Sequence, residues 1–144
     1  MDAGTVGSQF PEPERGQERP LADVVGVERS DPYTVEGSLL TDVGGTLGAS
    51  VLSTPGMIGV MERTSAVLAY EGLPEGTATV GFEVCVKHVG AAVEGARITA
   101  RARLAEVVDE RKLFFEVEVV EGERTIGVGT HQRRVIPVAA DAGG

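Results

Sequence analysis

The chain contains one cysteine, Cys85, among its 144 residues. A single cysteine cannot form a disulfide within the chain, and there is no CxxC pair or cysteine and histidine cluster with the ligands that a structural zinc ion needs. We therefore expect a protein of the reducing cytoplasm that holds no metal ion and no other cofactor.

Long apolar runs are also missing from the sequence. No stretch approaches the roughly 20 apolar residues that span a bilayer, and the N-terminus has neither the basic start nor the apolar run of a signal peptide. We expect a protein that is neither exported nor anchored in a membrane.

Positive charge is in the minority. The chain has 13 lysines and arginines against 22 acidic residues, for a formal charge of −9. Such a field repels phosphate backbones, so we expect no binding to nucleic acid. The same field repels any phosphorylated ligand, which would therefore need arginines close to its binding site.

Three common catalytic motifs are absent: the GxSxG elbow, the phosphate-binding P-loop and the GxGxxG turn. Serine hydrolase, nucleotide hydrolase and Rossmann dehydrogenase functions therefore have no support in the sequence.

The residues that are present fit one domain, because 42% of them are apolar and can build a core. Residues 1–20 mix proline, glycine and charge and are expected to form a flexible tail. Residues 21–138 are expected to form the folded domain, and residues 139–144 a second short tail.

The strongest helix signal starts at Thr54-Pro55, where a hydroxyl suited to an N-cap precedes a proline at the first helical position. Apolar residues then recur at spacings of three and four, which predicts a helix over residues 55–70. The loop before it, residues 40–53, is rich in glycine and suits a lid or a wall of a site.

After residue 76 the apolar period changes to two, which is typical of half-buried strands. Strands are predicted near residues 79–88, 97–104, 112–120 and 125–136, after a β piece within residues 24–40 that Ser30, Asp31 and Pro32 interrupt. The predicted fold is α+β: an antiparallel sheet of about five strands wrapped around one central helix, the hotdog architecture. The open sheet edges favour a homodimer.

Three side chains could carry chemistry, and each also has an ordinary structural explanation. His88 ends a predicted strand, where it is either a surface histidine or a proton carrier at the rim of a pocket. Glu62 lies within the apolar helix, as a carboxylate paired with an arginine or as a base or nucleophile. Thr54 either caps the helix or works with the amides of Gly56 and Met57, which suit an oxygen that gains negative charge.

Two further residues stand out less. Cys85 is flanked by apolar residues in a strand and is expected to be inert. His131 lies on the last strand beside two arginines, where a solvated sheet face is the default expectation and phosphate binding the alternative.

Three segments resemble the fluoroacetyl-CoA thioesterase family of hotdog proteins: TPGMIGVME, GFEVCVKHVGAAVEG and IGVGTHQRRVI, which begin at Thr54, Gly81 and Ile126. The resemblance implies that Thr54, Glu62 and His88 are catalytic, because the family's threonine, glutamate and histidine have the same spacings. It also implies that Gly81 lies near the acyl group and Arg133 near the CoA portion.

The resemblance implies an acyl-CoA thioesterase that releases a small acid and free CoA, with an acyl-carrier protein as the other possible carrier. The family's lid phenylalanines are missing, because this chain has Gly45, Leu47 and Gly48 in that loop, so fluoroacetyl selectivity does not follow. Two other functions stay open: a non-catalytic hotdog module that binds acyl-CoA or only dimerises, and an enoyl-thioester hydratase.

Overall fold

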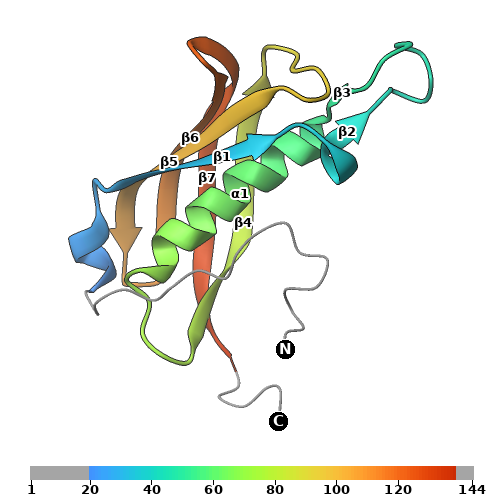
Figure 1. Cartoon of the computed structure of the whole chain (residues 1–144). Helices are drawn as coiled ribbons and strands as arrows, with labels where there is room; N and C mark the ends of the chain where they lie inside the picture. The colour runs from blue at the N-terminus through green and yellow to red at the C-terminus, as the bar shows by residue number, and fades with distance from the viewer. Residues whose placement is uncertain (1–19, 139–144) are drawn as a thin grey trace, which may run out of the picture.

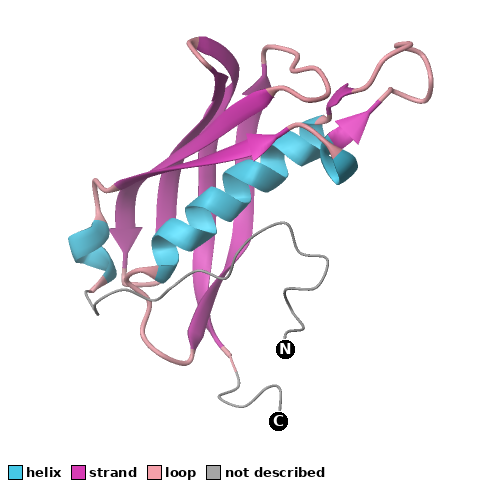
Figure 2. Ribbon diagram, viewed as in Figure 1, coloured by secondary structure: helices cyan, strands magenta, loops and turns pink. Residues whose placement is uncertain are grey.

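The computed structural model describes residues 20–138. One helix lies along one face of a five-stranded antiparallel sheet (Figures 1 and 2). This arrangement confirms the predicted α+β hotdog fold. The expected tails, apart from Pro20, lie outside the described residues.

The elements follow one another in an order close to the predicted one. They are the 3-10 turn Leu21–Val24, β1 (Glu28–Thr34), the 3-10 turn Gly37–Leu39, β2 (Leu40–Thr41), β3 (Val51–Leu52), α1 (Thr54–Tyr70), β4 (Thr77–His88), β5 (Arg97–Val108), β6 (Lys112–Glu121) and β7 (Arg124–Pro137). The sheet has the order β1-β5-β6-β7-β4, so β1 and β4 are its edges.

The core lies between α1 and the middle of the sheet. The helix contributes Met57, Val60, Met61 and Leu68, which are at most 1% exposed. The facing positions of β5 include Ala100 and Ala102. Because these side chains are small, the helix can pack closely on the centre of the sheet.

The β1 strand corrects one expectation. Ser30, Asp31 and Pro32 do not interrupt it, because all three lie inside one strand that pairs with β5. An edge strand needs hydrogen bonds on one side only, so it tolerates a proline that would break a central strand.

A β-bulge in β4 corrects a second expectation. The alternation of Val80, Phe82, Val84 and Val86 predicts one apolar face, but Gly81 pairs with Arg133 and Glu83 with Gln132, which leaves Phe82 as an extra residue. Directly paired residues share a face, so Gly81 faces the helix together with the buried Arg133. Phe82 lies on the outer face, where the Arg134 guanidinium stacks 3.7 Å from its ring centre.

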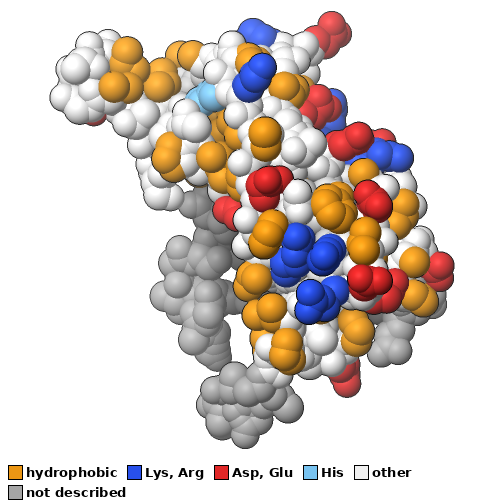
Figure 3. Space-filling view, turned by 180° about the vertical axis from the view of Figure 1, so that it is seen from behind, with side chains coloured by type: hydrophobic (Ala, Val, Ile, Leu, Met, Phe, Trp, Pro, Cys, Tyr) orange, Lys and Arg blue, Asp and Glu red, His pale blue; other side chains and the backbone are white. Residues whose placement is uncertain are grey.

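The outer face of the sheet carries charges of both signs with hydrophobic side chains between them (Figure 3). Arg101 pairs with Glu118 and Arg103 with Glu116 across β5 and β6. At the β4 edge the hydrophobic side chains are open: Val80 is 44% exposed and Phe82 61% exposed. Within residues 20–138 no strand pairs with the free side of β4.

Candidate active site

Thr54 and His88 form the first part of the site. Thr54 is the first residue of α1, and His88 is the last residue of β4. The Thr54 Oγ1 lies 2.8 Å from the His88 Nδ1, within hydrogen-bonding distance. The structure therefore brings together two of the three residues for which the resemblance implies catalysis.

A glycine on β7 lies beside the start of α1. Gly127 pairs with His88 across the sheet, and a Cβ built on Gly127 would overlap the sulfur of Met57 in the first turns of α1. A larger residue at this position would have to displace the end of the buried Met57 side chain. The absence of a side chain at Gly127 therefore leaves room for Met57 beside the strand that carries His88.

The second ring nitrogen of His88 has an unusual environment. Its Nε2 is buried and has no hydrogen-bond partner within residues 20–138. If Thr54 donates its hydroxyl hydrogen to Nδ1, the neutral ring carries its hydrogen on Nε2. A buried polar atom without a partner costs free energy, so this nitrogen marks a place where a partner from outside the chain would be stabilising.

The start of α1 corrects the expected cap. Ser53, not Thr54, is the N-cap, because its Oγ accepts a hydrogen bond of 2.9 Å from the amide of Gly56. The amide of Met57 donates to the carbonyl oxygen of Ser53. Neither Gly56 nor Met57 thus has a free N–H group for an acyl oxygen, and the predicted oxyanion role of Gly56 does not fit the structure.

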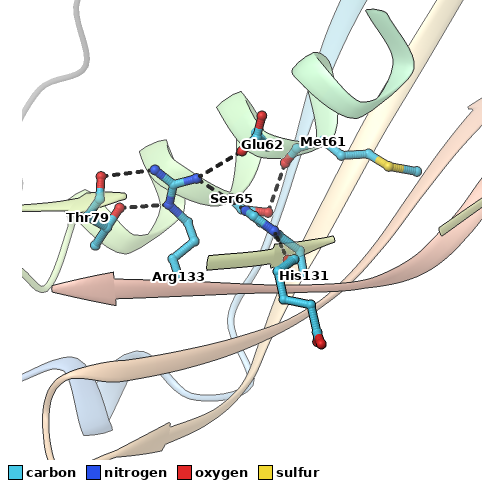
Figure 4. Close-up of polar contacts among 7 residues, drawn as sticks. Met61, Glu62, Ser65, Thr79, His131 and Arg133 are labelled. Atoms are coloured by element: carbon cyan, nitrogen blue, oxygen red, sulfur yellow. Dashed lines mark hydrogen bonds and ion pairs between the residues drawn. The ribbon is translucent and has the colours of Figure 1, made fainter. Parts of the chain in front are cut away.

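Glu62 belongs to a second group of residues, about two turns further along α1 (Figure 4). Its Oε2 lies 3.9 Å from the Arg133 Nη1, so the carboxylate forms a loose ion pair with a strand arginine. Its side chain keeps 41% exposure. Gly81 lies beneath it, and a Cβ on that glycine would be only 2.7 Å from the same oxygen.

Arg133 is held from below by β4 and β7. Its Nε donates to the Thr79 hydroxyl at 2.8 Å and its Nη2 to the Thr79 carbonyl at 3.0 Å. Burial lowers the pKa of the guanidinium and the Glu62 carboxylate acts to raise it. With its side chain 9% exposed, Arg133 lies below the surface beside Glu62.

His131 completes this group and corrects the expectation of a solvated face. It is 1% exposed and its ring stacks on Phe115, with 6.1 Å between the ring centres. Its Nδ1 lies 2.8 Å from the carbonyl oxygen of Glu83, and its Nε2 lies 3.2 Å from the Arg133 Nη1. Its position two residues before Arg133 on a strand is the sequence signal that could have linked the two residues.

The site residues thus form two groups and not one. Thr54 and His88 lie at one end of β4, and Glu62 lies over Gly81 nearer the other end. Eight helical residues span about 12 Å at 1.5 Å each, so Glu62 does not reach Thr54 along one helix. Within one chain the three residues do not form a single site.

Other kinds of site find no support in the described part of the chain. Residues 20–138 contain no group of three histidine, cysteine or acidic side chains that could hold a metal ion. Over the same residues no helix is both long and apolar enough to span a membrane.

Known proteins resemble the chain in sequence and in fold. Residues 35–139 match the family model of the fluoroacetyl-CoA-specific thioesterase. The fluoroacetyl-CoA thioesterase of Streptantibioticus cattleyicolor is 35% identical over 86 residues, which are 60% of this chain and 61% of that protein. The matched part thus spans less than two thirds of that relative.

Solved structures agree with the family match. The fluoroacetyl-CoA thioesterase FlK superposes with a TM-score of 0.72 at 28% identity, over 79% of this chain and 88% of FlK. A hot-dog-like protein from Thermanaerovibrio acidaminovorans gives a TM-score of 0.71 at 22% identity, over 78% of this chain and 83% of that one, and shows the fold alone. Because the family model covers most of the described residues, the chain belongs to the fluoroacetyl-CoA-specific thioesterase family.

Proposed function

We propose that the chain is a cytoplasmic acyl-CoA thioesterase whose active site forms between two copies of it. The observation that carries the proposal is the division of the site residues into two groups along β4, whose outer edge pairs with no strand within residues 20–138. Family membership supports the reaction, since FlK is named for its action on fluoroacetyl-CoA.

Antiparallel pairing of two β4 edges would join the two groups. In such a pair, positions equally far from the two-fold axis lie opposite each other. We place the two-fold axis at Cys85, so that His88 lies three paired positions after it. Gly81 lies three paired positions before it, because the bulged residue Phe82 has no partner and is not counted. His88 of one copy then faces Gly81 of the other, with Glu62 above it.

Exposure and hydrogen bonding support this pairing. The β4 edge exposes Val80, Phe82 and Val84, which a second copy would cover. The unpaired His88 Nε2 would gain the Glu62 carboxylate of the second copy as an acceptor. The pairing also explains how Thr54 and Glu62 could act on one substrate although they are about 12 Å apart along one helix, because the two residues would come from different helices.

The proposed mechanism uses the joined groups on a thioester carbonyl near the start of α1. The Glu62 carboxylate of one copy attacks the carbonyl carbon or directs a water molecule at it. His88 of the other copy carries a proton from Nε2 to the leaving CoA thiolate, and the Thr54 hydroxyl, which donates to Nδ1, holds the imidazole in the tautomer that can do so. If Glu62 attacks, a water molecule must then hydrolyse the mixed anhydride between Glu62 and the acyl group, so on either route the products are an acid and free CoA.

The proposed substrate is a small acyl thioester. The loop between β2 and β3, residues 42–50, extends away from the helix (Figure 1) and exposes Val43 and Leu47. It lacks the aromatic side chains expected of a fluoroacetyl-selective lid, so the acyl preference is best found with an acyl-CoA panel and a thiol-reactive dye. A panel without turnover would direct the search to acyl-carrier proteins.

A subunit-mixing experiment tests the function and the shared site together. Thr54→Ala and Glu62→Ala should each be folded and lose acyl-CoA hydrolysis by about 100-fold or more. After unfolding and refolding as an equimolar mixture, half of the dimers are mixed and each holds one intact site of two. The mixture should therefore regain about a quarter of the wild-type activity.

Two outcomes would contradict the proposal in different ways. A mixture that stays as inactive as its components would show that the site lies within one chain. Wild-type protein that binds acyl-CoA in calorimetry without releasing thiol would favour a ligand-binding module, and product without free thiol would favour a hydratase.

A matched control uses the only cysteine, Cys85, which is exposed on β4. A short bis-maleimide should link the two copies of the wild-type chain at the proposed axis and should not link Cys85→Ser. Monomeric wild-type protein after this treatment would argue against pairing through β4.

A further inference from the structure

His131 is the most deeply buried ionisable side chain near the proposed site, and the proposed reaction makes no use of it. It lies on β7, opposite Val84 of β4 and Phe115 of β6. Its exposure is 1%. A polar ring at this depth needs hydrogen-bond partners for both nitrogens.

The partners of the ring fix its tautomer. A carbonyl oxygen only accepts, so the Nδ1 that lies 2.8 Å from the Glu83 carbonyl must carry the hydrogen. A guanidinium only donates, so the Nε2 that lies 3.2 Å from the Arg133 Nη1 must be the bare nitrogen. His131 is therefore neutral, with Nδ1–H as donor and Nε2 as acceptor.

This tautomer gives Arg133 a hydrogen-bond acceptor. Its Nε and Nη2 are bound to Thr79, and its Nη1 donates to His131. One of the two Nη1 hydrogens is bound to His131, and together with the bonds to Thr79 this fixes the guanidinium where Nη1 lies 3.9 Å from the Glu62 Oε2, beyond hydrogen-bonding distance but close enough for attraction between the charges. Without His131, the guanidinium loses one of these bonds and can turn so that Nη1 donates to Glu62.

We propose that His131 is a positioning residue that acts through Arg133 and keeps the Glu62 carboxylate free for the thioester. This inference rests on the proposed function of Glu62. The charged and titratable groups that face the ring are Arg133 from its own strand and Glu62 from α1. Protonation of His131 removes the acceptor, places two positive charges together and releases Arg133 to bind Glu62.

The kinetic test compares three variants, with acetyl-CoA as substrate and detection of free thiol. His131→Leu removes the acceptor, and we expect kcat to fall about tenfold or more while KM stays within about twofold. His131→Gln keeps a carboxamide that can donate and accept, and we expect it to restore kcat to within about threefold at neutral pH. Val117→Ala, another core change, is the control and should retain the wild-type kcat.

The pH dependence of kcat distinguishes a positioning role of His131 from a role in core packing alone. In the wild-type protein the acid limb of kcat should include the protonation of His131, and this ionisation should be missing from His131→Gln. An unchanged acid limb in His131→Gln, or a His131→Leu kcat within about twofold of the wild type, would overturn the inference.

A spectroscopic readout works without turnover. The chain has only two histidines, so 15N spectra of the imidazoles can be assigned with His88→Gln, and His131 should appear as the Nδ1–H tautomer. An Nε2–H tautomer would overturn the inference whatever the activity. Absence of thiol release by the wild-type protein would instead contradict the proposed function, and the inference would fall with it.

Discussion

Gly81 matters through the side chain that it lacks. The Glu62 carboxylate occupies the space where a Cβ would lie, and the His131 Cε1 and the Arg133 Nη1 are 3.6 and 3.7 Å from the same point. This one residue therefore borders three members of the second group. Its backbone is not in the left-handed region, so the glycine is needed for space and not for conformation.

Gly81→Ala should lower activity more than stability. The new Cβ would displace the end of the flexible Glu62 side chain, which costs little in folding, and we expect kcat to fall by about tenfold or more. The melting temperature should change little. A variant with wild-type kcat would show that the placement of Glu62 over Gly81 is not needed for catalysis.

His131 should make stability depend on pH. Burial lowers its pKa from the ordinary value of 6.5, the bond to the Glu83 carbonyl acts to raise it, and the charge of Arg133 lowers it. Between the lowered pKa and 6.5 the unfolded chain holds a proton that the folded chain does not. The free energy of unfolding therefore falls as the pH drops through this window, by about 1.4 kcal/mol for each unit of pKa difference.

The measurement is urea unfolding at several pH values on either side of 6.5. The wild-type protein should lose stability faster than His131→Gln below pH 6.5, and the two curves should run parallel above it. Curves that stay parallel below pH 6.5 would contradict a lowered pKa for His131.

The residues of the site differ in how far the sequence reveals them. Residue type and position mark Thr54, Glu62 and His88 as candidates, the spacings shared with the thioesterase family imply that they are catalytic, and the structure joins Thr54 to His88. The spacing of two places His131 and Arg133 on one face of a strand, but it could not show that this face is buried beside Glu62. Their burial depends on which face of β7 the helix covers, and that face is set by pairing between distant strands.

At the scale of elements, α1 was the most predictable part of the fold. Its apolar period and the proline in its first turn gave bounds within one residue of those observed. The cap was wrong by one position because Ser53 and Thr54 can both accept an amide hydrogen bond. Only the backbone conformation of Ser53, which is extended, decides between the two.

Two matched variants test which hydroxyl caps the helix. Ser53→Ala should lower the free energy of unfolding by about 1 kcal/mol, because the Gly56 amide loses its acceptor. Thr54→Ala should change it by less than about 0.5 kcal/mol, although it removes activity. Chemical denaturation of both variants decides the question, and a larger loss for Thr54→Ala would restore Thr54 as the cap.

The strands were less predictable than the helix. The period of two located the long strands, but it could not show that the face changes at Phe82 or that β1 continues through Pro32. Both features depend on the neighbouring strand: a bulge is defined by the residues opposite it, and a proline is tolerated because β1 is an edge of the sheet that residues 20–138 form.

At the scale of the whole molecule, charge acts against the proposed substrate. The formal charge of −9 repels the phosphates of CoA at long range. Arg133 does not offset this repulsion at the surface, because its side chain is 9% exposed. The association of the protein with acyl-CoA should therefore be slowest at low salt, where the negative field is least screened.

The kcat/KM for acetyl-CoA should rise by about twofold between about 20 and about 200 mM salt, as the screening length shortens. The acetyl thioester of N-acetylcysteamine carries no phosphate and is the matched control, with a kcat/KM that should not change. A fall with salt for acetyl-CoA would show that local positive groups outweigh the net charge.

The extra residue in β4 shifts the alternation of its side chains, so that odd-numbered residues face the helix before Phe82 and even-numbered residues face it afterwards. Substitution of Phe82 changes only an outer side chain. Deletion of Phe82 would remove the bulge and leave Gly81 opposite Arg133 and Glu83 opposite Gln132, so every other side chain of β4 would keep its face. An added residue beside Phe82, unless it joined the bulge, would turn the preceding residues over, and Gly81 and Thr79 would then point away from Glu62 and Arg133. Between residues 81 and 83, a missing residue should therefore be more frequent among working relatives than an added one.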